Sequence, residues 1–293
     1  MDWTRQIDIY CERVSDAFWA EPVNALTNIA FILAGVAALA LHARRAGRPM
    51  GRVAWLGLLM ATGLVALLSN LVGGVWAATA SGAPLWLVAT TTAASLGILG
   101  LALTWAPRAF PDPALSWPAL WLSANAIVVG IGSFLFHTVA QPWAGAADTG
   151  PIMMFILGYF VVAMRCFAEL SWGRAALATF GFLLGMVALS AALRPLDGIL
   201  GGSQSYIPAL VALIAVGAWL HRRRAHPAGR SLMQAGGLFA VSLTFRSLDG
   251  PICDVFPLGT HFLWHIFNGW VFWVLLGALV RHGAPTPAPR RSG

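Results

Sequence analysis

Charged side chains are scarce in this sequence, and lysine is absent altogether. Only 10% of the 293 residues are charged, 58% are hydrophobic, and all 18 basic residues are arginine. The mean hydropathy is +0.74. Soluble domains carry about 25% charged residues, so this composition excludes a soluble protein and predicts an integral membrane protein.

An uninterrupted apolar leader is also missing. Arg5, Asp8, Glu12, Arg13 and Asp16 interrupt the first twenty positions, whereas a cleavable signal peptide has an apolar stretch of about 7 to 15 residues. We therefore expect the N-terminal segment to be retained and ordered.

Apolar runs long enough to cross a bilayer, about 20 residues each, recur along the chain. They predict an all-α polytopic membrane protein with nine helices. We divide the chain into a polar N-terminal segment (1–23), one transmembrane helical domain (24–281) and a proline-rich, disordered tail (282–293). The expected helices are 24–41, 53–75, 85–105, 117–137, 148–164, 173–193, 206–220, 232–248 and 261–280.

The arginines give this topology an orientation. With nine helices the loops alternate sides, and all but Arg5, Arg13, Arg194 and Arg246 fall on the side of the C-terminus. The positive-inside rule then places the N-terminus outside and the C-terminus in the cytoplasm. The net charge of +7 is explained by this topology and by anionic lipid headgroups, so a nucleic-acid partner gains no support.

The same topology separates the histidines. His137, His261 and His265 reach the outer leaflet inside apolar runs, where an unpartnered imidazole is costly and ionisable groups are usually functional. The remaining four lie beside arginines at the cytoplasmic surface, and we expect them to be solvated there. They are His42, His221, His226 and His282.

His265 follows His261 by four positions, which places both imidazoles on one helix face. This is the spacing of helical two-histidine zinc sites. The pair alone fits structural hydrogen bonding or haem ligation as well. With His137 at the same depth, three imidazoles and one open position match a catalytic zinc site.

Two further polar residues are expected at this level. Ser133 is one helical turn before His137 and could either pack between helices or donate to a developing oxyanion. Asp148 opens the next predicted helix. The helix dipole could stabilise its negative charge there. Alternatively, Asp148 could serve as the general base and acid when water attacks a carbonyl.

The N-terminal segment is rich in oxygen ligands, which suit Ca²⁺ better than zinc. Contact with lipid headgroups is the alternative. Cys11 in this segment and Cys253 in the last outer loop both lie on the oxidising side, so they form either a disulfide or two free thiols. The acidic and amide side chains from position 8 up to the start of the first expected helix are Asp8, Glu12, Asp16, Glu21 and Asn24.

Four sequence features resemble the alkaline ceramidases, and particularly their bacterial relatives in a superfamily of seven-helix membrane hydrolases. The resemblance covers approximately residues 8–45 and 111–280. The matching stretches are Y-C-E-R at 10–13, W-A-E-P-V-N-A-L-T-N at 19–28, G-I-G-S-F-L-F-H at 130–137 together with Asp148, and G-T-H-F-L-W-H at 259–265.

The resemblance implies zinc held by the three outer histidines, with Ser133 and Asp148 in the site. It also implies a structural or regulatory calcium site and a disulfide between Cys11 and Cys253. The calcium ligands that match are Glu12 and Glu21, and Asp8 and the Tyr10 carbonyl are the best further candidates, although Asp8 is displaced by one position.

The chain departs from this family in its helix count. The family core has seven helices, and residues 51–109 look like an inserted pair, which contains no histidine, acid or cysteine. Because two helices preserve parity, the site residues stay at the outer face. We expect the inserted pair to pack against lipid or form an oligomer contact.

The expected function is hydrolysis of the amide bond of ceramide or a related N-acyl lipid by a zinc enzyme, at the periplasmic face of a bacterial inner membrane. The alternatives are a lipid esterase or a lipid receptor with the same metal site. A haem-binding electron-transfer protein is a further alternative. Haem ligation would not require Ser133, Asp148 or a third histidine, so these residues argue against it.

Overall fold

The computed structural model describes residues 2–80, 86, 89–90, 93–94, 108, 112 and 114–283, with side chains of the first stretch described as far as residue 65. Within these residues the structure is helical. The expected helix at 85–105 lies outside the described helices, and so does most of the tail expected at 282–293.

The other eight expected helices coincide with helices of the structure. Six of the described helical segments are long and apolar enough to cross a membrane, and the chain is therefore an all-α, multi-pass membrane protein. The long helices are α1 with α2 (Pro22–Thr27 and Ile29–Ala46), α3 (Met50–Ala80), α5 (Trp117–Val139), α6 (Pro142–Cys166), α7 (Trp172–Ala192), α9 (Ile207–Arg224), α10 (Ala228–Leu248) and α11 (His261–His282).

Two of these helices fall outside the six. α10 is 21 residues long but less apolar, and the part of α3 with described side chains is a shorter apolar stretch, Met50–Val65. Short elements fill the connections: η1 (Arg194–Leu196), α8 (Asp197–Leu200) and η2 (Ser203–Ser205) precede α9, and η3 (Gly250–Ile252) follows α10.

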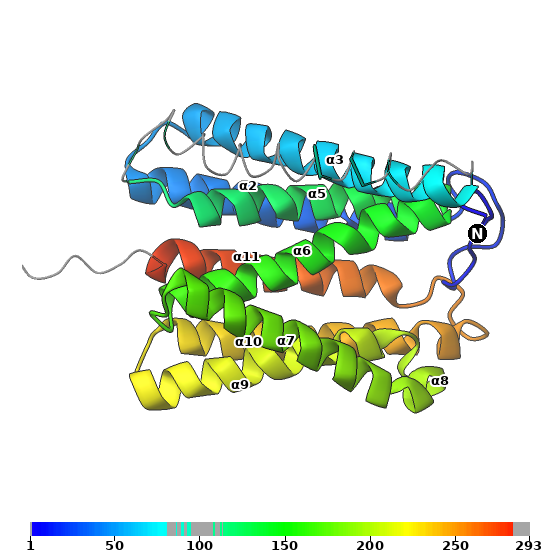
Figure 1. Ribbon diagram of the computed structural model, residues 1–293. Coiled ribbons are helices and arrows are strands. Elements are labelled where there is room, and N and C mark those ends of the chain that lie inside the picture. Colours follow the sequence, from blue (N-terminus) through cyan, green and yellow to red (C-terminus); the bar gives the residue numbers. More distant parts are fainter. Residues whose placement is uncertain are drawn as a thin grey trace, which may run out of the picture.

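The long helices run side by side as a bundle (Figure 1). α5 packs against α2, α3 and α6, whereas α11 packs against α2 and α10, and α9 lies between α7 and α10. α5 and α11 also touch each other. The N-terminal segment crosses the end of the bundle at which α11 begins, which brings it over the helices that carry the histidines.

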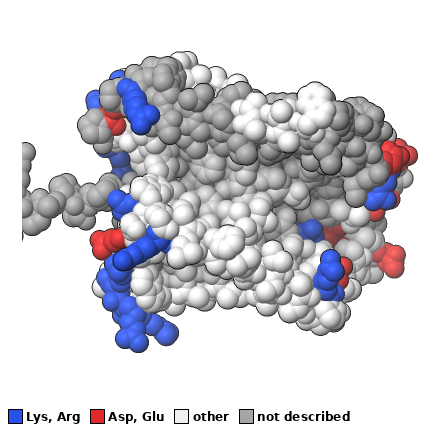
Figure 2. Space-filling model, viewed as in Figure 1, with Lys and Arg blue, Asp and Glu red and all other residues white. Residues whose placement is uncertain are grey.

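Charged side chains gather near the two ends of the bundle on the face that Figure 2 shows, and the described residues between them on this face are uncharged. We call the end where α2, α9 and α11 finish the arginine-rich end, because each of these helices has arginine in its last turn. We call the opposite end, where α11 begins at His261, the histidine end.

Two expectations need correction. α6 begins at Pro142, a residue whose fixed φ suits the first helical position. Asp148 therefore lies inside α6 and does not open the helix. His42 was expected to be solvated but is 3% exposed, and its Nε2 accepts the N–H of Ser116, just before α5, at 3.0 Å.

Candidate metal centre

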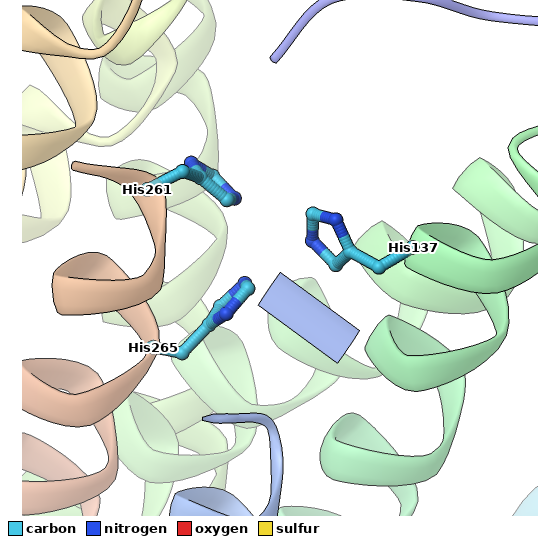
Figure 3. A group of neighbouring side chains, drawn as sticks. All are labelled: His137, His261 and His265. Atoms are coloured by element: carbon cyan, nitrogen blue, oxygen red, sulfur yellow. The ribbon is translucent and has the colours of Figure 1, made fainter. Parts of the chain in front are cut away.

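Three imidazoles meet at the histidine end of the bundle. His261 and His265 are one turn apart on α11, and His137 reaches toward them from the last turn of α5 (Figure 3). One ring nitrogen from each lies within 4.8 Å of the others. All three side chains are buried, with 1 to 2% of their surface exposed.

His137 is oriented by a carboxylate from the N-terminal segment. Its Nδ1 lies 2.6 Å from Glu21 Oε2, and Glu21 also accepts from Arg13 Nε at 2.5 Å and from Asn24 Nδ2 at 3.1 Å. A carboxylate held by an arginine is ionised and can only accept. His137 therefore carries its proton on Nδ1, which leaves the Nε2 lone pair free for a metal.

His265 is oriented in a similar way by a hydroxyl. Thr27 Oγ lies 3.0 Å from His265 Nδ1, and the same hydroxyl donates its proton to the carbonyls of Val23 and Asn24. A threonine hydroxyl has a single proton. With that proton on a carbonyl, the hydroxyl oxygen can accept from His265 Nδ1–H, an arrangement that would leave Nε2 as the free ligand atom.

His261 is placed by packing and by its backbone. The ring of Tyr10 stacks on the imidazole with centroids 3.7 Å apart. The Asp249 carboxylate accepts the backbone N–H groups of His261 and Thr260 at 2.9 and 2.7 Å, which satisfies two of the free N–H groups at the start of α11.

Two of the imidazoles carry a buried ring nitrogen without a partner. His137 Nε2 and His261 Nδ1 are buried and have no hydrogen bond among the described residues, and Asp148 Oδ1 is in the same condition. Buried polar atoms are rarely left unpaired, and an absent ion or water is one accepted reason. Three imidazoles are a donor set that zinc prefers, so the residues fit this metal.

Ser133 and Asp148 lie beside the histidines. Ser133 is one turn before His137 on α5, and its side chain lies next to the Asp148 carboxylate of α6. A close approach of the two helices permits this contact, since a Cβ on Gly132 would collide with the Ala147 backbone. The three-nitrogen set does not include Asp148, which leaves its carboxylate available for proton transfer.

Three of the four residues expected to bind calcium have partners within the structure. Glu12 accepts the N–H groups of Val23 and Asn24 at 2.7 and 2.8 Å, at the start of α1. Glu21 contacts Arg13, Asn24 and His137. Asp8 is exposed, and the Tyr10 carbonyl accepts the Arg13 N–H at 3.1 Å. Calcium binding stays a prediction.

Cys11 and Cys253 form a disulfide, so the alternative of two free thiols is wrong. The bond joins the N-terminal segment to the loop that follows η3 and leads into α11. Cys11 N–H also donates to Asp249 Oδ2 at 3.1 Å. Tyr10, Cys11 and Asp249 thus hold the segment against the start of α11.

Sequence reasoning did not find three residues that shape the site. Thr27 contacts His265 Nδ1, Arg13 holds Glu21, and Asp249 caps α11. Arg13 gave one usable signal, since it is the only cation among the acids of residues 8–21. The sequence around Thr27 offers no such signal, because an isolated threonine is an ordinary polar residue of an apolar helix.

Comparison of the chain with protein-family models, with curated proteins and with solved structures found no match.

Proposed function

We propose that this chain is a zinc-dependent membrane hydrolase that cleaves the amide bond of ceramide or a related N-acyl lipid, giving a sphingoid base and a fatty acid. The observation that carries the proposal is the set of unpartnered, buried atoms on His137, His261 and Asp148. Metal ligands and a general base meet there in one place, as metal-assisted hydrolysis requires.

The histidines would hold the ion, and the neighbouring residues would move protons. Zinc bound there would supply a Lewis acid that activates water and polarises the amide carbonyl. Asp148 would accept a proton from the attacking water and deliver it to the leaving amine. Ser133 would donate a hydrogen bond to the oxyanion that develops on the carbonyl.

An apolar pocket next to the histidines supports a lipid substrate. Residues of α2, α6, α7, α9, α10 and α11 line it. One of them is Phe31 of α2, whose ring packs edge-on against His265 with ring centroids 6.2 Å apart. Trp264 and Leu275 both line it and are eleven residues apart on α11, about 16 Å of helix. A long acyl chain could lie along this pocket with its carbonyl at the histidines.

We further propose that the N-terminus and the site face the periplasm of a bacterial inner membrane. The arginine-rich end would then be cytoplasmic, as the positive-inside rule requires. A lipid of the outer leaflet would present its headgroup-proximal amide at the depth of His261, while its tails remain in hydrocarbon.

Assays on the purified protein test this proposal. We expect about one zinc per chain and hydrolysis of ceramide that stops when zinc is removed by chelation. His265→Ala should lose zinc and activity together. Asp148→Asn should keep zinc and lose about 10²- to 10⁴-fold in kcat, the usual share of general acid–base catalysis. Full activity of both variants without zinc would overturn the proposal.

An acyl ester of the same chain length, assayed beside the amide, separates an amidase from the esterase alternative. Catalytic turnover of either lipid argues against a receptor. A haem protein would show a Soret band and no stoichiometric zinc. The close packing of Tyr10 and His261 beside His137, with centroids 3.7 to 5.1 Å apart, leaves no flat gap for a porphyrin.

A further inference from the structure

The side chain of Arg246 lies near both the histidine site and the apolar pocket. Arg246 is near the end of α10, and its guanidinium lies over the rings of Tyr206 and Trp264, 5.7 Å from each centroid. Both rings line the pocket. Arg246 is also within electrostatic range of His261 and Asp148. Its charge is therefore at the outer end of the pocket, next to the proposed reaction site.

This guanidinium has no carboxylate partner among the described residues. No acidic oxygen there lies within the 4 Å of an ion pair, whereas Arg13 and Arg48 hold Glu21 and Asp112 at 2.5 Å. The two acids that face Arg246 are Asp148 and Asp249. Asp249 is already bound by backbone N–H groups, and Asp148 lies beside Ser133.

Most of the hydrogen-bonding capacity of Arg246 is also unused. A guanidinium has five N–H donors, and the hydrogen bond that Arg246 makes within the described chain runs from Nη1 to the Gly201 carbonyl at 2.7 Å. Gly201 and Gly202 both have positive φ, and a Cβ on Gly202 would lie 3.5 Å from Nη2. The chain thus approaches one edge of the guanidinium and leaves its other donors for a ligand.

We propose that Arg246 binds an anionic group in the headgroup of the lipid substrate, a carboxylate, phosphate or sulfonate close to the scissile amide. This inference rests on the proposed function for its choice of a lipid amide. Planar, bidentate recognition of such oxyanions is the chemistry in which arginine exceeds lysine. The preferred substrates are then anionic N-acyl lipids, ahead of ceramide with a free hydroxyl headgroup.

Two amides with the same acyl chain isolate the headgroup. N-palmitoylglycine carries a carboxylate, N-palmitoylethanolamine is neutral, and both release the same fatty acid. We expect kcat/KM of the wild type to favour the anionic amide by about tenfold or more, the size of one hydrogen-bonded charge contact. Arg246→Gln should abolish this preference, and Arg246→Lys should retain part of it.

The matched control is Arg194→Gln, which removes the same charge from an exposed position at the same end. It should leave the preference unchanged. A purely structural role of Arg246, in holding the Gly201 loop, predicts a lower melting temperature of Arg246→Gln with an unaltered preference for the anionic amide. That result would overturn the inference.

A binding assay separates this inference from the proposed function. Hexadecyl sulfonate and hexadecanol share a chain and cannot be hydrolysed, and their binding is measured by the thermal shift of the purified protein. We expect the sulfonate to stabilise the wild type more, and Arg246→Gln to remove the difference. If the difference appears but no amide is cleaved, the anion site stands and the hydrolase fails. If the sulfonate and the alcohol stabilise the wild type equally while the amides are cleaved, the hydrolase stands and the anion site at Arg246 fails.

Discussion

His137 Nδ1 lies 2.6 Å from Glu21 Oε2, which joins a buried imidazole of α5 to the segment before the first helix. The contact continues outward, because Arg13 pairs with the second oxygen of Glu21 and donates to the His137 carbonyl at 3.0 Å. All three side chains are buried. The N-terminal segment is therefore a structural part of the histidine site.

We expect Glu21→Gln to weaken zinc binding by about tenfold, because carboxylate partners of metal-binding histidines typically contribute 10- to 100-fold in affinity. The amide keeps a hydrogen bond to Nδ1 but loses the charge that raises the basicity of the ring. It also leaves Arg13 buried without a counter-charge, so the melting temperature should fall. Competition with a chromogenic chelator measures the affinity.

Glu169→Gln is the control for this substitution. Glu169 pairs with Arg224 in an exposed contact at the arginine-rich end, where ion pairs contribute little. It should change neither zinc affinity nor melting temperature. Equal zinc affinity of Glu21→Gln and the wild type would show that Glu21 does not act on His137.

The meeting of the three histidines could be predicted from the sequence, because helical spacing and the number of apolar runs are enough to place them. His261 and His265 share a helix face by their spacing, and counting apolar runs placed His137 at the same end. The partners of these rings could not be found in this way. Glu21 and Thr27 are 116 and 238 residues away in sequence from the imidazoles they contact. Such contacts depend on how helices pack, which periodicity does not specify.

The error at Asp148 has a local cause. The helix expected at 148–164 begins earlier because Pro142 occupies the first position of α6, where no backbone N–H is needed. Pro151 lies inside the same helix, and its carbonyl accepts from Asn125 of α5 at 3.0 Å. A side chain of α5 thus bonds the backbone of α6 beside this proline.

Thr27 offers a second test of the tautomer argument. Thr27→Val keeps the shape of the side chain but removes the acceptor for His265 Nδ1–H, so the ring can turn or change tautomer. We expect zinc affinity to fall by about tenfold. Thr27→Ser keeps the hydroxyl and should bind zinc as the wild type does. If both variants bind equally well, the hydroxyl does not orient His265.

The contact of α5 with α6 sets the place of Ser133 relative to Asp148. Gly132→Ala would push its methyl group into the Ala147 backbone, and backbone cannot yield as a side chain can. We expect a lower melting temperature, with overpacking costing about 1 to 3 kcal/mol, and a loss of hydrolysis larger than the loss of zinc. Activity and zinc content are measured on the same samples.

Gly185→Ala is the matched control on α7. A Cβ there meets nothing within 4 Å, and alanine favours a helix over glycine by about 1 kcal/mol. This variant should be as stable as the wild type or more so, and fully active. Wild-type activity of Gly132→Ala would mean that the close approach of the helices does not position Ser133 and Asp148.

The disulfide should support the metal site as well as the fold. Cys11 is next in sequence to Tyr10, whose ring stacks on His261, and Cys253 lies on the loop before α11. Removing a native disulfide costs about 2 to 5 kcal/mol in small secreted domains. We expect Cys253→Ser to melt at a lower temperature and to lose zinc to a chelator faster. Cys166, a free cysteine where α6 ends, provides the control: Cys166→Ser should do neither.

Reduction of the protein gives the same test without a substitution. A thiol reductant should accelerate zinc loss from the wild type and from Cys166→Ser, and leave the rate of Cys253→Ser unchanged, because that variant has no bond to reduce. Acceleration in all three would mean that the reductant competes for the metal. No acceleration in the wild type, with the bond shown to be reduced, would mean that Asp249 and the Tyr10 ring hold the segment in place without the covalent link.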